Sequence, residues 1–223
     1  MKDAPGSVRL DAAPEILPLF PLSGAVLLPD GQLPLNIFEP RYLAMVDDAL
    51  AGARLIGIIQ PREEIHLEKP ALYDVGCAGR ITSFTETEDG RYLINLTGAR
   101  RFRLAEELAS DTPYRLARPD WSAYEIDTVD DDTADDVDRD ELLEALRHYL
   151  DAENLQVEWE RAAEAPTEAL IISLAMGCPF PPNEKQAILE AQTLAEQAAC
   201  LTALMAFSGA GSGDGEGGST PVQ

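Results

Sequence analysis

The sequence predicts an α+β fold, in which a small β pseudo-barrel with one inserted helix is followed by an all-α helical subdomain. Three observations support this prediction. Short apolar runs bounded by turn residues fill residues 15–119, and one stretch among them has helical spacing. Residues 139–207 repeat apolar side chains at helical spacing. Residues 120–138, between the two halves, are strongly acidic and typical of a linker.

The first half contains the predicted strands. The opening strand, Ile16–Leu22, carries Pro18 and Pro21, so we expect it to be irregular or at an edge. Glycines at 76, 79 and 98 allow bulges, bends and a tight turn. The other predicted strands are Leu33–Phe38, Arg54–Gln60, Tyr73–Thr82, Tyr92–Leu96, Phe102–Leu104 and Tyr114–Ala117. Short strands with such glycines favour a closed or half-closed barrel.

One helix is expected among these strands, at Pro40–Ala51. Its apolar residues recur at helical spacing. Pro40 suits the first helical turn, where its missing N–H costs nothing, and Gly52 ends the helix.

The second half begins with Asp127–Glu141, which holds nine acids and one base. Such a run repels itself, so we expect an unstructured acidic linker over 120–138. A helical subdomain over 139–207 follows, with an apolar stripe at Leu142–Leu150, a helix at Thr167–Met176 and one long helix at about Asn183–Phe207. Residues 208–223 are rich in Gly and Ser and are predicted to be a disordered tail.

Charge narrows the possible partners. The chain has 17 basic and 40 acidic residues, a net charge of −23. Residues 1–119 carry a net −4 and residues 120–223 a net −19. A surface this negative repels phosphates, so we expect no nucleic-acid and no membrane partner. No signal peptide or membrane span is recognisable, and three scattered cysteines argue against a disulfide framework, so we expect a cytoplasmic protein.

Motifs that carry catalysis or bind a metal or cofactor are not found. The sequence contains no P-loop, no G-x-S-x-G, no H-E-x-x-H and no G-x-G-x-x-G after a strand. Two histidines, in different halves, offer little for a triad or a metal site. We therefore predict no catalytic residues, no metal, no cofactor and no enzymatic activity.

One polar cluster stands out, at the junction of a strand and the helix. Glu39, Arg41 and Tyr42 follow the apolar residue Phe38 directly. We expect Glu39 to face the helix N-terminus, Arg41 to point away from it, and the rings of Phe38 and Tyr42 to be buried with Val46. Two interpretations stay open: a structural clasp that pins the helix to the barrel, or a ligand site. Arg101 and Phe102, after the Gly98 turn, are its expected counterpart.

These residues carry a resemblance to a known family. Leu17–Leu22, Pro29 and Phe38–Tyr42 resemble the start of the N-terminal substrate-binding domain of the Lon ATP-dependent protease. The segments VGCAGRITSF, DGRYLINLTGARRFRL and PFPPNEKQAILEA are similar as well, so the resemblance covers about residues 15–207. It implies a pseudo-barrel related to PUA domains, a helical subdomain, and a role in recognising polypeptides. The ATPase and Ser–Lys protease modules of Lon are absent from this sequence.

Two functions follow as hypotheses. The first is a non-catalytic protein-interaction module, linked to protein quality control, that binds exposed apolar segments of polypeptides or a partner protein. The second is a small-molecule-binding protein or unrecognised enzyme that uses the region of Glu39, Arg41 and Arg101. The sequence does not predict an oligomeric state.

Overall fold

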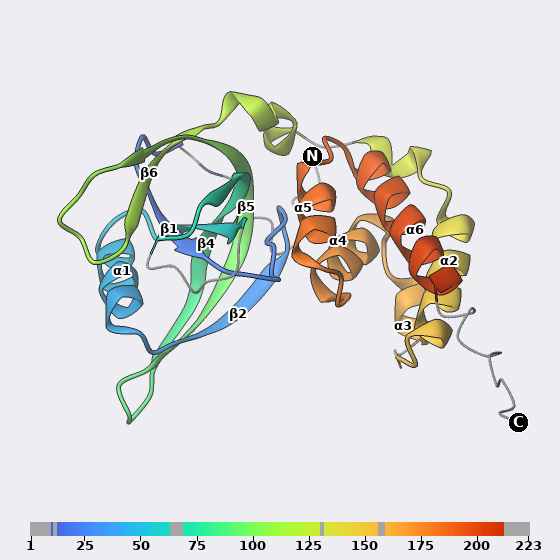
Figure 1. Cartoon of the computed structure of the whole chain (residues 1–223), viewed down its shortest axis with the longest axis horizontal. Helices are drawn as coiled ribbons and strands as arrows, with labels where there is room; N and C mark the ends of the chain where they lie inside the picture. The colour runs from blue at the N-terminus through green and yellow to red at the C-terminus, as the bar shows by residue number, and fades with distance from the viewer. Residues whose placement is uncertain (1–9, 11–12, 63–68, 130–131, 156–158, 212–223) are drawn as a thin grey trace, which may run out of the picture.

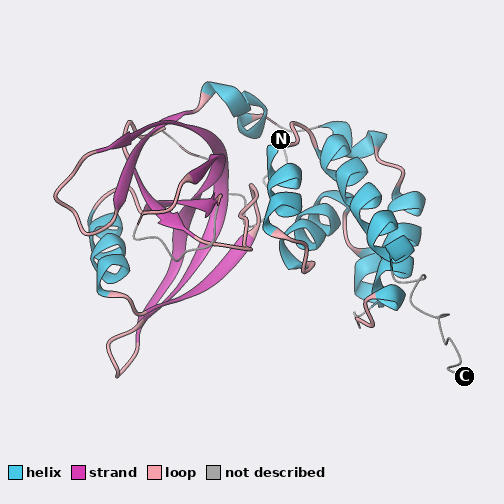
Figure 2. Cartoon of the chain, in the orientation of Figure 1, coloured by secondary structure: helices cyan, strands magenta, loops and turns pink. Residues whose placement is uncertain are grey.

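A computed structural model describes residue 10 and residues 13–62, 69–129, 132–155 and 159–211. It contains a coiled six-stranded sheet with one helix, and a group of helices formed by the second half of the chain (Figures 1 and 2). The predicted α+β class, with one inserted helix and a helical C-terminal region, is confirmed.

The strands form a ring. They are β1 (Leu17–Pro21), β2 (Gln32–Ile37), β3 (Leu55–Pro61), β4 (Leu72–Glu86), β5 (Tyr92–Leu108) and β6 (Arg115–Asp120). Their order is β2-β5-β4-β3-β1-β6, and β5 also pairs with β6, which closes the ring. β1 and β3 run parallel, and the remaining pairs are antiparallel.

β5 corrects one prediction. The sequence predicts a turn at Thr97–Arg100 between two strands, but a single strand runs from Tyr92 to Leu108. A glycine is needed at 98 because two backbone segments approach closely there, and not because the chain turns. A Cβ atom at this position would lie 1.9 Å from the carbonyl oxygen of Leu28. The backbone of Gly98 accepts a hydrogen bond from Asp30 at 2.9 Å and donates one to Gly31 at 2.8 Å.

Helix α1 spans Pro40–Ala51, as predicted, and ends at Gly52. It buries Met45 and Val46 against the sheet. In Figure 1, α1 lies on the side of the barrel that faces away from the C-terminal helices. The surface around α1 and the surface of the C-terminal helices therefore lie on opposite sides of the barrel.

The core has two parts. A smaller cluster, which includes Leu17, Leu19 and Phe102, fills the inside of the barrel. The larger cluster runs from α1 through the other face of the sheet into the C-terminal helices, where Phe180 and Leu189 belong to it. Because this cluster is continuous, burial of apolar surface holds the barrel and the helices together.

The predicted acidic linker is wrong in part. Two short 3-10 helices occupy it, η1 (Ser122–Thr128) and η2 (Asp132–Asp136). The side chain of Tyr124 is only 1% exposed, and the side chain of Asp127 is 4% exposed in an ion pair. The described residues of η1 are held in place because Tyr124 and Asp127 find a buried partner, Arg101, on the barrel, which offsets the entropy of ordering.

The helices are α2 (Arg139–Ala152), α3 (Trp159–Glu164), α4 (Thr167–Gly177), α5 (Pro182–Glu190) and α6 (Leu194–Gly211). The single helix predicted over Asn183–Phe207 is wrong, since residues 191–193 separate α5 from α6. Thr193 Oγ1 accepts from the backbone N–H of Glu196 at 3.2 Å, and Glu196 Oε2 accepts from that of Gln192 at 2.7 Å. These bonds start a new helix as a capping box does.

The end of α6 also differs from the prediction. The helix continues to Gly211, past the expected tail boundary at Ser208, and residues 212–223 lie outside the described residues. Among the helices that the structure describes, none combines the length and apolar character needed to cross a bilayer.

Candidate functional site

The polar cluster at the start of α1 is an exposed ion pair. Arg41 Nε donates to Glu39 Oε2 at 2.9 Å, and Arg41 Nη2 lies 2.7 Å from the same oxygen. The expectation that Arg41 points away from Glu39 is therefore wrong. Glu39 makes no side-chain cap hydrogen bond, and its backbone carbonyl accepts from the N–H groups of Tyr42 and Leu43. Its carboxylate is free to pair with the charged donor.

The two rings of this cluster are separated. Phe38 is 63% exposed, so the expected burial of its ring with Tyr42 is wrong. The reason is strand alternation: Ile37 faces the core, which turns the next residue outward. Tyr42 is buried, its ring centroid lies 4.3 Å from that of Phe20, and burial raises its pKa.

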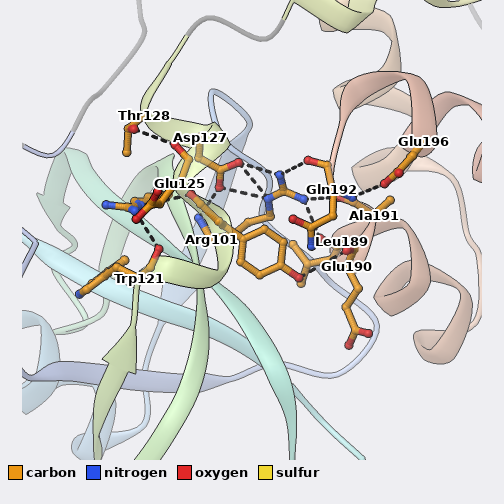
Figure 3. A network of polar contacts seen from close by, with 12 residues as sticks. Arg101, Trp121, Glu125, Asp127, Thr128, Leu189, Glu190, Ala191, Gln192 and Glu196 are labelled. Carbon is orange, nitrogen blue, oxygen red and sulfur yellow. Dashed lines mark hydrogen bonds and ion pairs between the residues drawn. The ribbon is translucent and has the colours of Figure 1, made fainter.

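Arg101 is the most heavily bonded side chain of the set (Figure 3). Its guanidinium bonds the carboxylate of Asp127, with Nη2 and Oδ1 2.6 Å apart, and lies 4.4 Å from the centroid of the Tyr124 ring. Nη1 donates to the carbonyls of Leu189 (3.1 Å) and Ala191, and Nη2 to that of Gln192 (2.9 Å). All five N–H donors are thereby engaged.

Phe102 points the other way from Arg101, into the barrel. It is fully buried, and its ring lies 5.9 Å from that of Trp121. Arg101 therefore joins the barrel to η1 and to the segment between α5 and α6. Among these described residues, Arg41 pairs with Glu39 and Arg101 with Asp127, and Tyr42 and Phe102 belong to different apolar clusters, so the structure does not bring the two expected halves of the site together.

A groove follows α1 instead. We define the α1 groove as two hollows that are both lined by Tyr114 and by residues of α1. The first, of about 160 Å³, is mainly apolar and is lined among others by Ile16, Pro18 and Leu116. The second, of about 700 Å³, is lined by Arg41, Tyr42, Lys69, Glu107, Tyr114 and Arg115, among others. Its walls come from α1, the end of β5 and the start of β6.

Tyr114 bridges the groove. Its hydroxyl donates to Asp48 Oδ2 on α1 at 2.6 Å. Burial and this hydrogen bond raise the pKa of Tyr114 to about 12. The phenol therefore stays neutral near neutral pH and ties the loop before β6 to the helix.

The second hollow holds a three-residue charge cluster. Arg115 Nη2 and Glu107 Oε2 are 2.5 Å apart, and Lys69 Nζ lies 2.5 Å from Glu107 Oε1. Arg115 Nη1 also donates to the carbonyl of Pro70 at 2.8 Å. Sequence reasoning identified Arg41 and Tyr42 but missed Lys69, Tyr114 and Arg115, because they stand at strand ends and in loops where no periodic pattern marks them.

The described residues form no site for a metal ion and no polar group that awaits a cofactor. Within the described part of the chain, no group of three His, Cys, Asp or Glu side chains could hold a metal ion. In the same part, every buried side-chain nitrogen or oxygen has a hydrogen-bond partner, so no orphaned polar atom marks a missing group.

Comparison with known proteins gives the family. Residues 16–206 match the ATP-dependent protease La (LON) substrate-binding domain. Lon protease 2 of Myxococcus xanthus is 29% identical over 196 residues, which cover 83% of this chain and 23% of that protein. Lon protease of Anaeromyxobacter dehalogenans is also 29% identical, over 83% of this chain and 22% of its own length. The chain spans less than a quarter of these relatives, and their catalytic modules are not within the aligned part.

Solved structures agree on the fold. A Lon N-terminal domain protein from Xanthomonas campestris superposes with a TM-score of 0.58 at 24% identity, covering 84% of this chain and 97% of that one. The N-terminal domain of a Mycobacterium avium complex Lon protease gives 0.62 at 15% identity, covering 86% and 98%. Because the family match spans most of the residues and both structures share the architecture, this chain belongs to the family of Lon substrate-binding domains.

Proposed function

We propose that this chain is a non-catalytic recognition module for protein quality control, and that it binds exposed apolar segments of other polypeptides in the α1 groove. The family is that of a substrate-binding domain, which supports a polypeptide as the ligand. Binding of an apolar segment in this groove needs neither a cofactor nor a metal.

The α1 groove is the observation that carries the proposal. Its apolar hollow, with Ile16 51% exposed, offers a place for an apolar side chain without prior unfolding. The 12 residues of α1 extend for about 18 Å. An extended segment of roughly five residues covers that length. A site of this size belongs to the small, transient class of interfaces, so we expect micromolar or weaker affinity.

A small-molecule site is the second candidate, and the volume of the second hollow favours it. About 700 Å³ lies within the range of ligand pockets. The version of this hypothesis that includes Arg101 has little support, because all five of its N–H groups bond protein acceptors. Arg41 lines the hollow and is 41% exposed in its pair with Glu39, so a ligand can reach it.

A titration of a labelled, permanently unfolded protein tests the proposal. We expect saturable binding to the purified chain, and we expect it to persist at high salt because burial of apolar surface drives it. Ile16→Asp, which places a charge in the apolar hollow, should weaken binding at least about tenfold, the effect of losing one buried apolar side chain.

Phe207→Asp is the matched control. Phe207 is 81% exposed on α6 and undergoes the same change of apolar residue to acid, away from the groove. It should leave the affinity unchanged. No binding by the unaltered chain at about 100 µM, or an equal loss in both variants, would refute the proposal. The chain should also neither hydrolyse ATP nor cleave the unfolded protein. It should not bind RNA, because its net charge of −23 repels phosphates.

A further inference from the structure

Among the described residues, the walls of the second hollow carry more positive than negative charge. Three described cations line it, Arg41, Lys69 and Arg115, together with one described carboxylate, Glu107. Glu107 pairs with both Lys69 and Arg115. Arg41 has its own partner in Glu39, outside the lining. Two cations therefore share one carboxylate, and one positive charge is not balanced by the described residues that line the hollow.

The cluster is ordered before any ligand arrives. Burial opposes ionisation of Glu107, but hydrogen bonds from Arg115 and Lys69 hold its pKa below the usual range. The side chain of Arg115 is 17% exposed and is fixed by Glu107 and by the carbonyl of Pro70. Lys69 is 66% exposed, so its ammonium group can meet a ligand from the solvent.

This charge balance contrasts with the rest of the chain. Acidic residues outnumber basic ones by 40 to 17, and most of the excess lies in the second half. The C-terminal helices lie across the barrel from α1 (Figure 1). At physiological ionic strength their field is screened within about 8 Å, so it acts weakly on a ligand in the groove.

We infer that the polypeptide segment bound in the α1 groove carries a carboxylate two or three residues from its apolar side chain. The apolar residue enters the first hollow, and the carboxylate meets Lys69 and Arg115 in the second. Tyr114 lines both hollows, so the two adjoin, and at roughly 3.3–3.6 Å per residue two or three residues of extended chain lead from one to the next. This inference rests on the proposed function and adds the chemical class of the segment.

Two labelled peptides that differ in a single residue provide the test. Both carry Leu, two Ser residues and then either Glu or Gln. At physiological ionic strength we expect the Glu peptide to bind about three- to fivefold more tightly, the effect of one partly exposed ion pair. The preference should shrink at high salt, while the affinity of the Gln peptide stays the same.

Two protein variants test which side chain causes the preference for the Glu peptide. Lys69→Gln should remove it and leave the Gln peptide unaffected. Arg91→Gln is the matched control, because Arg91 is also an exposed cation paired with a carboxylate, Asp89, but lies in the turn between β4 and β5. This variant should keep the preference.

The outcomes separate the two proposals. If neither peptide nor the unfolded protein binds, the proposed function fails, and this inference fails with it. If both peptides bind equally to the unaltered chain, or if Lys69→Gln weakens both peptides alike, only the inference of a carboxylate is overturned.

Discussion

Arg101 and Asp127 form a buried ion pair, with the side chains 3% and 4% exposed. The pair joins strand β5 to η1, and the remaining donors of Arg101 reach the segment between α5 and α6. One guanidinium thus bonds residues that lie 26 to 91 positions further along the chain.

Breaking this pair should strongly destabilise the protein. Asp127→Asn leaves Arg101 buried without its counter-charge, and we expect a loss of about 3 to 5 kcal/mol in the free energy of unfolding. Urea denaturation measures it. Arg118→Ala, which breaks the exposed pair with Glu106, should cost no more than about 1 kcal/mol. Equal losses in the two variants would contradict the buried role of Asp127.

Gly98→Ala should disrupt the crossing of β5 and the loop before β2. The new Cβ atom would lie 1.9 Å from the carbonyl oxygen of Leu28, so backbone has to move, at a cost of about 3 kcal/mol or more. Thermal unfolding or the soluble yield reports the effect. Gly177→Ala serves as the control, since a Cβ atom at this helical position meets nothing within 4 Å. A Gly98 variant as stable as that control would show that the close approach does not exist.

Stability should fall at alkaline pH through Tyr114. Its pKa is raised to about 12, from 10.0 for the free side chain, so the folded state holds the proton more tightly than the unfolded state. The stabilising contribution is therefore complete below pH 10 and is lost as the pH rises toward 12. Urea midpoints at pH 9 and pH 11 measure the loss. Tyr114→Phe should show a smaller decrease over this interval, and an unchanged decrease would exclude Tyr114 as its source.

The cysteines should be unreactive in the folded protein. Burial raises the pKa of Cys178 to about 11 and also raises the pKa values of Cys77 and Cys200. At pH 8 only about one molecule in a thousand then carries the Cys178 thiolate, the form that reacts. A disulfide reagent should label the half-buried Cys200 first and the other two only in denaturant. Rapid labelling of all three without denaturant would contradict the burial.

Local patterns predicted the local structure well. Helix α1 has the predicted bounds, because its apolar spacing, Pro40 and Gly52 all act within a few residues. The break between α5 and α6 was also visible in principle, since Thr193 and Glu196 have the spacing of a capping box. The break was concealed because Ile188, Ala191 and Ala195 keep helical spacing across it.

Long-range relationships were not predictable in the same way. Gly98 resembles a turn in sequence, but its role depends on Leu28, 70 residues earlier. The groove joins Lys69, Tyr114 and Arg115 to α1 only after the ring of strands has closed. Nothing in spacing or composition reports such contacts. The family resemblance supplied the architecture, but not the positions of these side chains.

The buried position of Asp127 also determines where the chain can be divided for separate study of its halves. A cut after residue 119, where the composition changes, would place Arg101 in the barrel fragment and its counter-charge, Asp127, in the helical fragment. The same cut would remove the carbonyls of Trp121 and Tyr124, which accept from Arg100 at 2.7 and 3.4 Å. A barrel fragment that keeps the counter-charge of Arg101 and the acceptors of Arg100 has to continue through Thr128, and even this fragment loses the carbonyls of Leu189, Ala191 and Gln192 that Arg101 bonds.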